Sequence, residues 1–263
     1  MTCGVVYKFK PRKRVNGTLF YCFEYFAMLR QYADAKFYIV GISDDDLAFV
    51  RQLFAEKYDA SIDGIVPIKT TDLYKLKLTH TIVLDIHTFV HCKEFFTNTV
   101  HCYSNDSHAS FRYKNDRRVI YYGSYAYQSY DVFSYLKLNF GIFRPLSGTG
   151  SSVYVSSSNP EIVARKQDVW DKMYDQPLIF KQMGTGVGNI FDSVDTLHYV
   201  HTTLDKNNRM IPEAFFYGKR VVIEHLTYDK LDSVQLRYDD IVANGLSNYT
   251  LTENDAIIQA CLK

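Results

Sequence analysis

Short apolar runs alternate with amphipathic stretches along this chain, and that alternation leaves few folds open to it. Apolar runs lie at 36–41, 65–68 and 81–86, and helical spacing of apolar residues occupies 18–32 and 43–58. The second half repeats the pattern, with apolar runs at 152–156, 177–181, 196–200 and 220–224. Alternating strands and helices form parallel sheets with helices on both faces. The sequence therefore predicts an α/β fold.

Capping residues mark the ends of several expected helices. Thr18, Ser43 and Thr252 are expected N-caps, because their hydroxyl oxygens can accept from the free N–H groups of a first turn. Gly218 is expected at the C′ position that ends a helix over 210–217. The remaining expected elements are strands at 5–7, 100–103, 118–122 and 141–143, and helices at 70–76, 160–173 and 253–262.

The length of 263 residues suits two domains of similar size. We expect an N-terminal Rossmann-like lobe over 1–135 and a C-terminal Rossmann-like lobe, including the terminal helix, over 136–263. A single large sheet domain is the alternative.

Composition narrows the environment of the protein and its class of partner. Thirty Lys and Arg against 29 Asp and Glu give a net charge of +1, which argues against a polyanion bound over the whole surface but allows a local basic patch. Five scattered cysteines without a CxxC pair indicate reduced thiols. The sequence shows neither a membrane-spanning apolar run nor a signal peptide. We expect a cytoplasmic protein.

The segment 199–224 has the clearest functional pattern. A strand is followed by a polar loop, a helix beginning near Pro212, a stop at Gly218 and a second strand. Ligands bind at the carboxyl ends of parallel strands, so this loop is expected on the ligand face. Arg209 offers a cation for phosphate, and Glu213 in the first helical turn can accept ribose hydroxyls. An acid that only stabilises the helix dipole is the alternative for Glu213.

Three short motifs in this segment resemble the donor-binding element of GT-B glycosyltransferases. Residues 205–209 read DKNNR, residues 212–214 read PEA and residues 218–221 read GKRV. The chain departs from the family at Arg220, where a proline is usual, and at Val221, where some members carry a second acid.

The resemblance implies a GT-B fold, with two Rossmann-like lobes, a nucleotide-sugar cleft between them, and a terminal helix that packs back on the first lobe. It implies that Glu213 binds the ribose and that Arg209 or Lys181 contacts the diphosphate. The glycine-rich loop 184–189 is either a phosphate cradle or a plain surface loop. A UDP-sugar is the expected co-substrate, and no further cofactor is expected to be required. The expected donor-binding residues are Gly17, Arg144, Lys181, Gly186, Asn189, Arg209 and Glu213.

Acids that follow strands are candidates for the general base that deprotonates an acceptor hydroxyl. Asp85 ends an apolar run and is expected to face the cleft; His87 and Asp106 are the rival candidates. Helix capping is the alternative role for Asp85, and a structural histidine is the alternative for His87.

No metal site is predicted. The aspartate triplet 44–46 is better explained by capping and dipole effects after Ser43. The spacing of His91, His101 and His201 does not fit a metal-ligand motif.

Two basic segments are expected to bind the acceptor. One follows the first strand at the cleft mouth, and the other, at 111–118, mixes cations with aromatic residues. Cations beside aromatic rings suit a phosphate backbone and an unstacked base, whereas a solvated turn is the alternative for the first segment. The expected acceptor-binding residues are Lys10, Arg12, Lys13, Arg14, Arg112 and Lys114.

This pattern resembles the phage enzymes that glycosylate hydroxymethylated cytosine in DNA. The resemblance implies glucosyl or arabinosyl transfer from a nucleotide sugar to 5-hydroxymethylcytosine in the cytoplasm of a host cell. A glycosyltransferase for lipopolysaccharide or another surface glycan is one alternative, although no amphipathic membrane-facing helix is evident. A nucleotide-binding module without transfer activity is the alternative of another class.

Overall fold

The structure is a computed structural model that describes residues 2–11, 15–103, 116–122, 139–142, 164, 168, 196–200, 209–224, 233–246, 251 and 255–263. The strands expected at 152–156 and 177–181 and the loop at 184–189 lie outside these residues. Within the helix expected over 160–173, residues 164 and 168 are described and both are helical.

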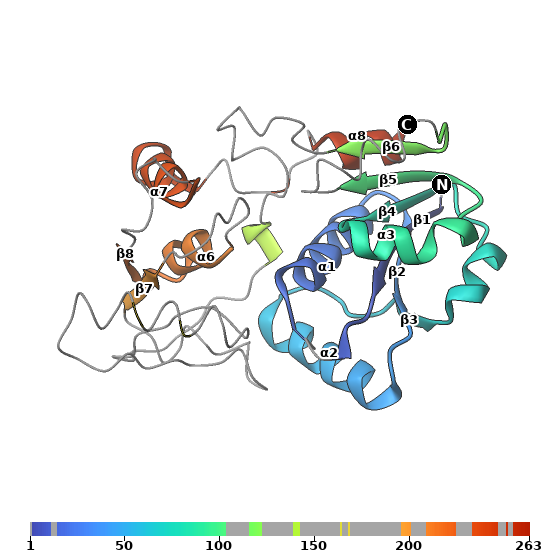
Figure 1. Cartoon of the computed structure of the whole chain (residues 1–263), viewed down its shortest axis with the longest axis horizontal. Coiled ribbons are helices and arrows are strands. Elements are labelled where there is room, and N and C mark those ends of the chain that lie inside the picture. Colours follow the sequence, from blue (N-terminus) through green and yellow to red (C-terminus); the bar gives the residue numbers. More distant parts are fainter. Residues whose placement is uncertain are drawn as a thin grey trace.

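A six-stranded sheet forms the larger part of the described fold (Figure 1). Its strand order is β3-β2-β1-β4-β5-β6, and every neighbouring pair is parallel. This is the strand order of the Rossmann fold. The prediction of a parallel α/β sheet is therefore confirmed. The strands are β1 (Thr2–Lys8), β2 (Asp34–Val40), β3 (Ile65–Ile68), β4 (His80–Val83), β5 (Thr99–Tyr103) and β6 (Val119–Tyr122).

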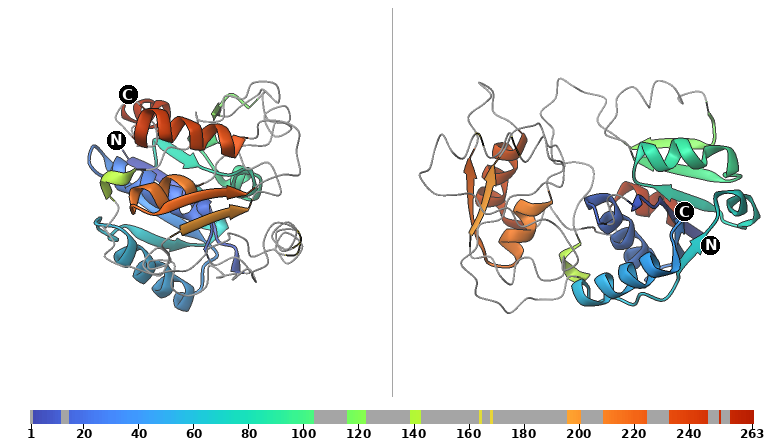
Figure 2. Two further views of the ribbon diagram at one scale, coloured as in Figure 1. Left: turned by 90° about the vertical axis from the view of Figure 1, so that its left-hand side faces the viewer. Right: turned by 60° about the horizontal axis from the view of Figure 1, so that its bottom comes forward.

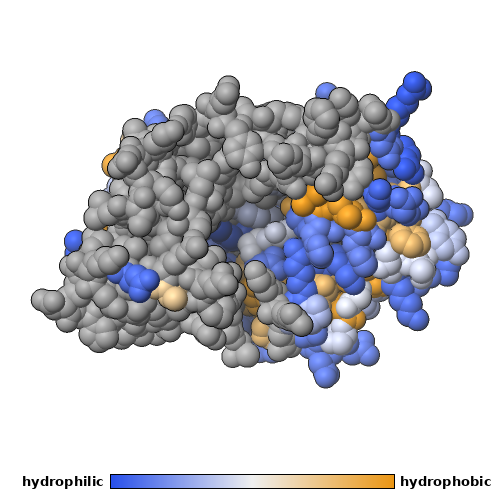
Figure 3. Space-filling model, viewed as in Figure 1, coloured by the Kyte–Doolittle hydropathy of each residue, from blue (hydrophilic) through white to orange (hydrophobic). Residues whose placement is uncertain are grey.

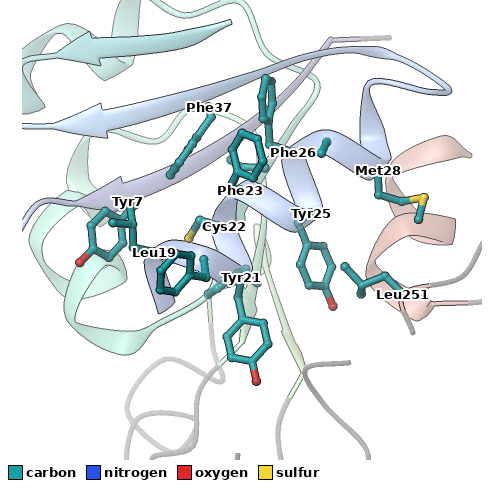
Figure 4. Close-up of a cluster of buried hydrophobic side chains, with 14 of the residues drawn as sticks. Tyr7, Leu19, Tyr21, Cys22, Phe23, Tyr25, Phe26, Met28, Phe37 and Leu251 are labelled. Atoms are coloured by element: carbon teal, nitrogen blue, oxygen red, sulfur yellow. The ribbon is translucent and has the colours of Figure 1, made fainter. Parts of the chain in front are cut away.

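Helices cover both faces of this sheet, as the alternation predicts. On one face lie α1 (Gly17–Leu29) and α2 (Asp44–Lys57), whose apolar residues share a core with Val5 and Tyr7 of β1. On the other face α3 (Ile86–Cys92) packs against Val6, together with the 3-10 helices η2 (Thr70–Lys75) and η3 (Lys93–Phe95). Figure 4 shows the first core, in which Phe23 and Phe26 of α1 lie beside Phe37 of β2.

The helix starts differ in part from those expected. Ser43 caps α2 as predicted, since its Oγ accepts from the backbone N–H of Asp46 at 3.2 Å. The predicted cap Thr18 is wrong, because Asn16 caps α1 through a 3.1 Å bond from the N–H of Leu19. The predicted cap Thr252 is also wrong, because Asp255 caps the terminal helix α8 (Ala256–Leu262). At each misassigned start another residue of a cap-forming type accepts from the N–H groups of the first turn.

Two further expectations need correction. The strand expected at 141–143 is instead the 3-10 helix η4 (Phe140–Ile142). Two helices, α3 and α7 (Ser233–Asn244), were not expected at all.

The segment singled out in the sequence has the predicted strand–helix–strand layout. It forms β7 (Thr196–Val200), α6 (Met210–Phe216) and β8 (Arg220–Glu224), and the two strands pair in parallel. Gly218 has φ +67°, the left-handed conformation expected of a residue that ends a helix. Figures 1 and 2 show this unit in orange, to one side of the six-stranded sheet.

The terminal helix α8 packs on the six-stranded sheet, which confirms a further expectation. The thiol of Cys3 donates to the carbonyl oxygen of Cys261 at 3.8 Å, and Tyr25 Oη donates to Asp255 at 3.2 Å. Leu251, just before the helix, lies beside Tyr25 in Figure 4. One continuous buried cluster joins residues of β1, α1, β7, α6 and α8. The division into lobes at 135/136 stays a prediction.

Among the described residues, no helix combines the length and the apolar character that a membrane span needs. In the view of Figure 3 their surface is largely hydrophilic, with smaller apolar areas.

Candidate functional site

The strand order reverses between β1 and β4, and this reversal indicates where a ligand binds. The sheet continues from β1 through β2 to β3 on one side, and through β4, β5 and β6 on the other. Val6 and Val83 are register partners, so β1 and β4 end beside each other. Helices leave two such strands on opposite faces and open a crevice at their carboxyl ends. The residues at this edge, which we name the carboxyl-edge group, are Lys8, Lys10, Asn16, Asp85 and Thr88.

Asp85 lies at the end of β4, where the sequence predicted it, and it also caps α3. Its Oδ1 accepts from the backbone N–H of Thr88 at 2.8 Å, and its Oδ2 accepts from Thr88 Oγ1 at 2.7 Å. Lys10 Nζ is 3.7 Å from Oδ1, and the two side chains are 31% and 15% exposed respectively. The carboxylate is thus held firmly beside a cation while part of its surface remains open to solvent.

A chain of hydrogen bonds joins the ends of the two strands. Thr88 Oγ1, which donates to Asp85, accepts from the backbone N–H of Lys8 at 2.9 Å. Asn16 links the start of α1 to β1, because its Nδ2 donates to Tyr7 Oη at 2.6 Å. Burial raises the pKa of Tyr7, so this phenol stays protonated. These bonds fix the positions of the carboxyl-edge group without a ligand.

Gly17 is the first residue of α1, and space is open beside it. A Cβ added at Gly17 would meet no atom of the described residues within 4 Å. The protein's own packing therefore does not require a glycine there. The donor role predicted for Gly17 stays a prediction.

Several basic side chains gather at the same edge of the sheet. Lys8 Nζ lies against the backbone of Gly41 at the end of β2, since a Cβ added there would be 2.7 Å from it. Burial lowers the pKa of His91, and the nearby charges of Lys8 and His87 lower it further. His87 itself is exposed in the first turn of α3. The edge thus combines one carboxylate with several basic groups, a setting suited to an anionic ligand.

Arg209 and Glu213 lie together, but their surroundings differ from the expected ones. Arg209 Nε donates to Glu213 Oε1, and Lys57 Nζ donates to Glu213 Oε2 at 3.0 Å. Arg209 also donates to Glu24 of α1 and, at 2.8 Å, to Tyr58 Oη. Arg209 is 7% exposed and Glu213 is 2% exposed. The five side chains, which we name the buried charge network, connect α6 to α1 and α2.

The two acids of the buried charge network have opposite pKa shifts. Burial alone would raise the pKa of Glu213, but the attraction of Lys57 and Arg209 outweighs it and the pKa is lowered. At Glu24 the effect of burial is the larger one. It raises the pKa by more than the charge of Arg209 and the hydrogen bonds from Arg209 and Tyr58 lower it. Glu213 faces two cations and Glu24 one, which explains the difference. Glu213 is therefore the acid held ionised.

This burial bears on the expectation that Arg209 and Glu213 face a nucleotide, which stays a prediction. Both oxygens of Glu213 accept from protein cations, and neither side chain is on an accessible surface in this conformation. A ribose could reach the carboxylate only after α6 separates from Lys57. The i,i+4 spacing of the pair could be seen in the sequence, whereas its partners from α1 and α2 could not.

The other sequence-predicted site residues lie outside the described residues. This holds for one catalytic candidate, two donor candidates besides those in the glycine-rich loop, and most of the two basic segments. They are Asp106, Arg144, Lys181, Gly186, Asn189, Arg12, Lys13, Arg14, Arg112 and Lys114.

A group of side chains that the sequence did not reveal lies at the opposite edge of the sheet. His80, His101 and Cys261 present ligand-type atoms that all lie within 4.8 Å of one another. Burial lowers the pKa of His80. At His101, burial and, to a smaller extent, the charge of His80 lower the pKa to about 4. The three residues come from β4, β5 and α8, and no local spacing in the sequence connects them.

Comparison with known proteins does not identify a family for this chain. No family model matches the chain, and no curated protein matches it. A search of solved structures finds a likeness to a candidate UDP-N-acetylglucosamine 2-epimerase from Listeria monocytogenes. The TM-score is 0.43 and the identity 9%, over 94% of this chain and 89% of that one. At this TM-score the likeness carries no argument.

Proposed function

We propose that the protein is a glycosyltransferase that moves a sugar from a nucleotide donor, with UDP as the nucleotide, to an acceptor hydroxyl. The observation that carries the proposal is the carboxyl-edge group. An acid and a lysine, Asp85 and Lys10, lie 3.7 Å apart at the strand reversal of a Rossmann-order sheet. The resemblance of residues 205–221 to the GT-B donor element supports the same function.

Asp85 is the proposed general base. Each of its oxygens accepts one hydrogen bond from Thr88, and a carboxylate oxygen has two lone-pair sites, so each can accept a further bond. In the proposed step the acceptor oxygen forms a bond to the anomeric carbon and loses its proton to Asp85. The bond from that carbon to the diphosphate breaks, and the diphosphate leaves with the electron pair. A cation such as Lys10 favours the charge that develops.

The donor role of Arg209 and Glu213 requires the buried charge network to open. Glu213 can accept ribose hydroxyls only if its bond from Lys57 is released. Under this proposal nucleotide and Lys57 compete for one carboxylate, and Lys57→Met raises the affinity for UDP. An unchanged UDP affinity in a folded Lys57→Met protein would limit Arg209 and Glu213 to holding α6 in place.

The favoured acceptor is 5-hydroxymethylcytosine in DNA. The lysines at the carboxyl edge, Lys8 and Lys10, suit a phosphate backbone. Retention on DNA that falls steeply with added salt supports this acceptor; salt-independent or absent retention favours a surface glycan instead.

A nucleotide-binding module without transfer activity is the second candidate. The observation that favours it is that Asp85 is already the N-cap of α3 through Oδ1, while its Oδ2 accepts from the hydroxyl of Thr88. A module of this kind binds UDP but releases none from a UDP-sugar.

Asp85→Asn separates the two candidates without removing the cap. Asparagine caps helices as well as aspartate does, so α3 is preserved while the negative charge is lost. We expect UDP release from UDP-glucose or a related sugar, with hydroxymethylated DNA present, to fall about 10²- to 10⁴-fold, and UDP affinity to stay the same. Asp63→Asn, at an exposed loop acid, is the matched control and should keep full turnover. Full turnover in Asp85→Asn would remove Asp85 as the base.

A further inference from the structure

The amino edge of the six-stranded sheet brings together two imidazoles and a thiol. His80 Nδ1 and His101 Nε2 are 2.9 Å apart, and Cys261 Sγ lies within 4.8 Å of both. His101 is 1% exposed, Cys261 is fully buried, and His80 is half-buried. The group therefore has two enclosed members and one that solvent can reach.

Strand register explains why the two imidazoles meet. Cys3 of β1 is the register partner of His80, and Ile82 of β4 is the partner of His101. Since side chains alternate along a strand, Cys3, His80 and His101 share the face of the sheet that carries α1 and α8. Figure 1 shows α8, in red, beside β5 and β6.

The terminal helix delivers the thiol to this face. Ile257, Ile258 and Cys261 are the buried residues of α8. The helix is held by the bond from Cys3 Sγ to the carbonyl oxygen of Cys261 and by that from Tyr25 to Asp255. The thiol of Cys261 is thus directed onto the strands by packing that is independent of any ion.

The geometry points to a zinc site whose ligands are His80 Nδ1, His101 Nε2 and Cys261 Sγ. Imidazole nitrogen and thiolate sulfur are the ligands that Zn²⁺ favours, and tetrahedral coordination separates nitrogen ligands by about 3.4 Å and nitrogen from sulfur by about 3.6 Å. The observed separations approach these values with small side-chain adjustments. On binding, Zn²⁺ replaces the proton of Cys261 Sγ, which passes to solvent.

The second nitrogen of His101 is already oriented for this role. Its Nδ1 lies 2.9 Å from Tyr122 Oη of β6, which fixes the ring and leaves Nε2 for the metal. Ligand histidines are commonly held in this way by a second hydrogen bond.

The role of the site is to hold the terminal helix on the sheet. It joins β4 and β5 to α8, and the neighbouring contact of Cys3 with Cys261 spans 258 positions in sequence. The carboxyl-edge group lies at the other end of the strands, so this zinc is not expected to take part in catalysis.

Metal binding to the full chain tests the assignment. After chelator is removed, the protein is titrated with Zn²⁺ and, separately, with Co²⁺, whose visible absorption reports tetrahedral coordination and sulfur ligation. We expect one ion per chain, with micromolar or tighter affinity. At a 100-fold excess over the dissociation constant, Zn²⁺ should raise Tm by about 5–10 °C.

Three variants make the result specific. His80→Ala changes a half-buried position and should retain the fold while weakening Zn²⁺ binding at least tenfold. Cys261→Ser should abolish the sulfur-to-cobalt band. Cys92→Ser, a buried cysteine in the core on the other face, should bind Zn²⁺ like the wild type. Absence of binding in the wild type, or equal binding in His80→Ala, would overturn the assignment.

Discussion

Lys57→Met tests whether the buried charge network holds α6 to the first sheet. Lys57 Nζ lies 3.0 Å from Glu213 Oε2, and the two side chains are 5% and 2% exposed. Methionine keeps most of the aliphatic stem but removes the cation, which leaves Glu213 with Arg209 as its remaining cation in the network. The loss of one member of a buried ion pair destabilises a protein by about 3–5 kcal/mol.

The same ammonium group also lies 4.5 Å from the centre of the Phe20 ring. A desolvated contact of this kind adds about 1–2 kcal/mol, so the expected loss lies toward the upper part of the range given for the ion pair. Urea unfolding followed by circular dichroism measures the free energy directly.

Lys75→Met is the matched control for this prediction. Lys75 Nζ is 2.7 Å from Asp72 Oδ1, but those side chains are 60% and 37% exposed, so solvent screens the pair and no measurable loss is expected. The double variant Lys57→Met/Glu213→Gln should be less destabilised than the sum of its single changes, by about 0.5–3 kcal/mol. A midpoint for Lys57→Met equal to that of Lys75→Met, at an unchanged slope, would refute the network.

Three further variants test separate parts of the fold by the same unfolding measurement. Asp255→Ala should lower stability by about 1–3 kcal/mol, because it removes the cap of α8; Asp255→Asn should retain most of it. Burial lowers the pKa of His101 from 6.5 to about 4. With a chelator present to keep metal ions away, the unfolded chain therefore binds a proton at His101 at a higher pH than the folded protein does. Acidification from pH 6.5 to 4 should therefore destabilise the protein by up to about 3 kcal/mol, and His101→Gln should remove this component. Gly41→Ala, at φ +70° and against Lys8 Nζ, should cost about 1–2 kcal/mol and more than Gly218→Ala, whose added Cβ meets nothing within 4 Å. Equal losses for the two glycine variants would show that Lys8 moves freely aside.

Much of the fold could be predicted because its signals are local. The apolar runs that became β2, β3, β7 and β8 are short and flanked by polar residues, and Ser43 is followed at once by a helical pattern. The misplaced caps show the limit of this approach. Thr18 and Asn16 are both acceptable caps by residue type, and tertiary contact decides between them, because Asn16 also donates to Tyr7.

A site residue and its partners could be predicted from the sequence only where they lie close together in the chain. The position of Asp85 follows from the end of a strand, and its cap partner Thr88 is three residues away. Arg209 is four positions from Glu213, but the other cation that binds this carboxylate, Lys57, is 156 positions away, and the sequence does not pair them. Glu24 was the available signal, since a charged residue inside the apolar helix α1 requires a buried partner. His80 and Cys261 offered no comparable signal.

A crystal structure of the protein with bound UDP shows whether the carboxyl edge of the six-stranded sheet is the nucleotide site. We expect the nucleotide at this edge, with its phosphates near Lys10 and the start of α1 and with Asp85 facing the position of the sugar. A nucleotide bound at another edge of the sheet, or no binding at millimolar UDP, would contradict it.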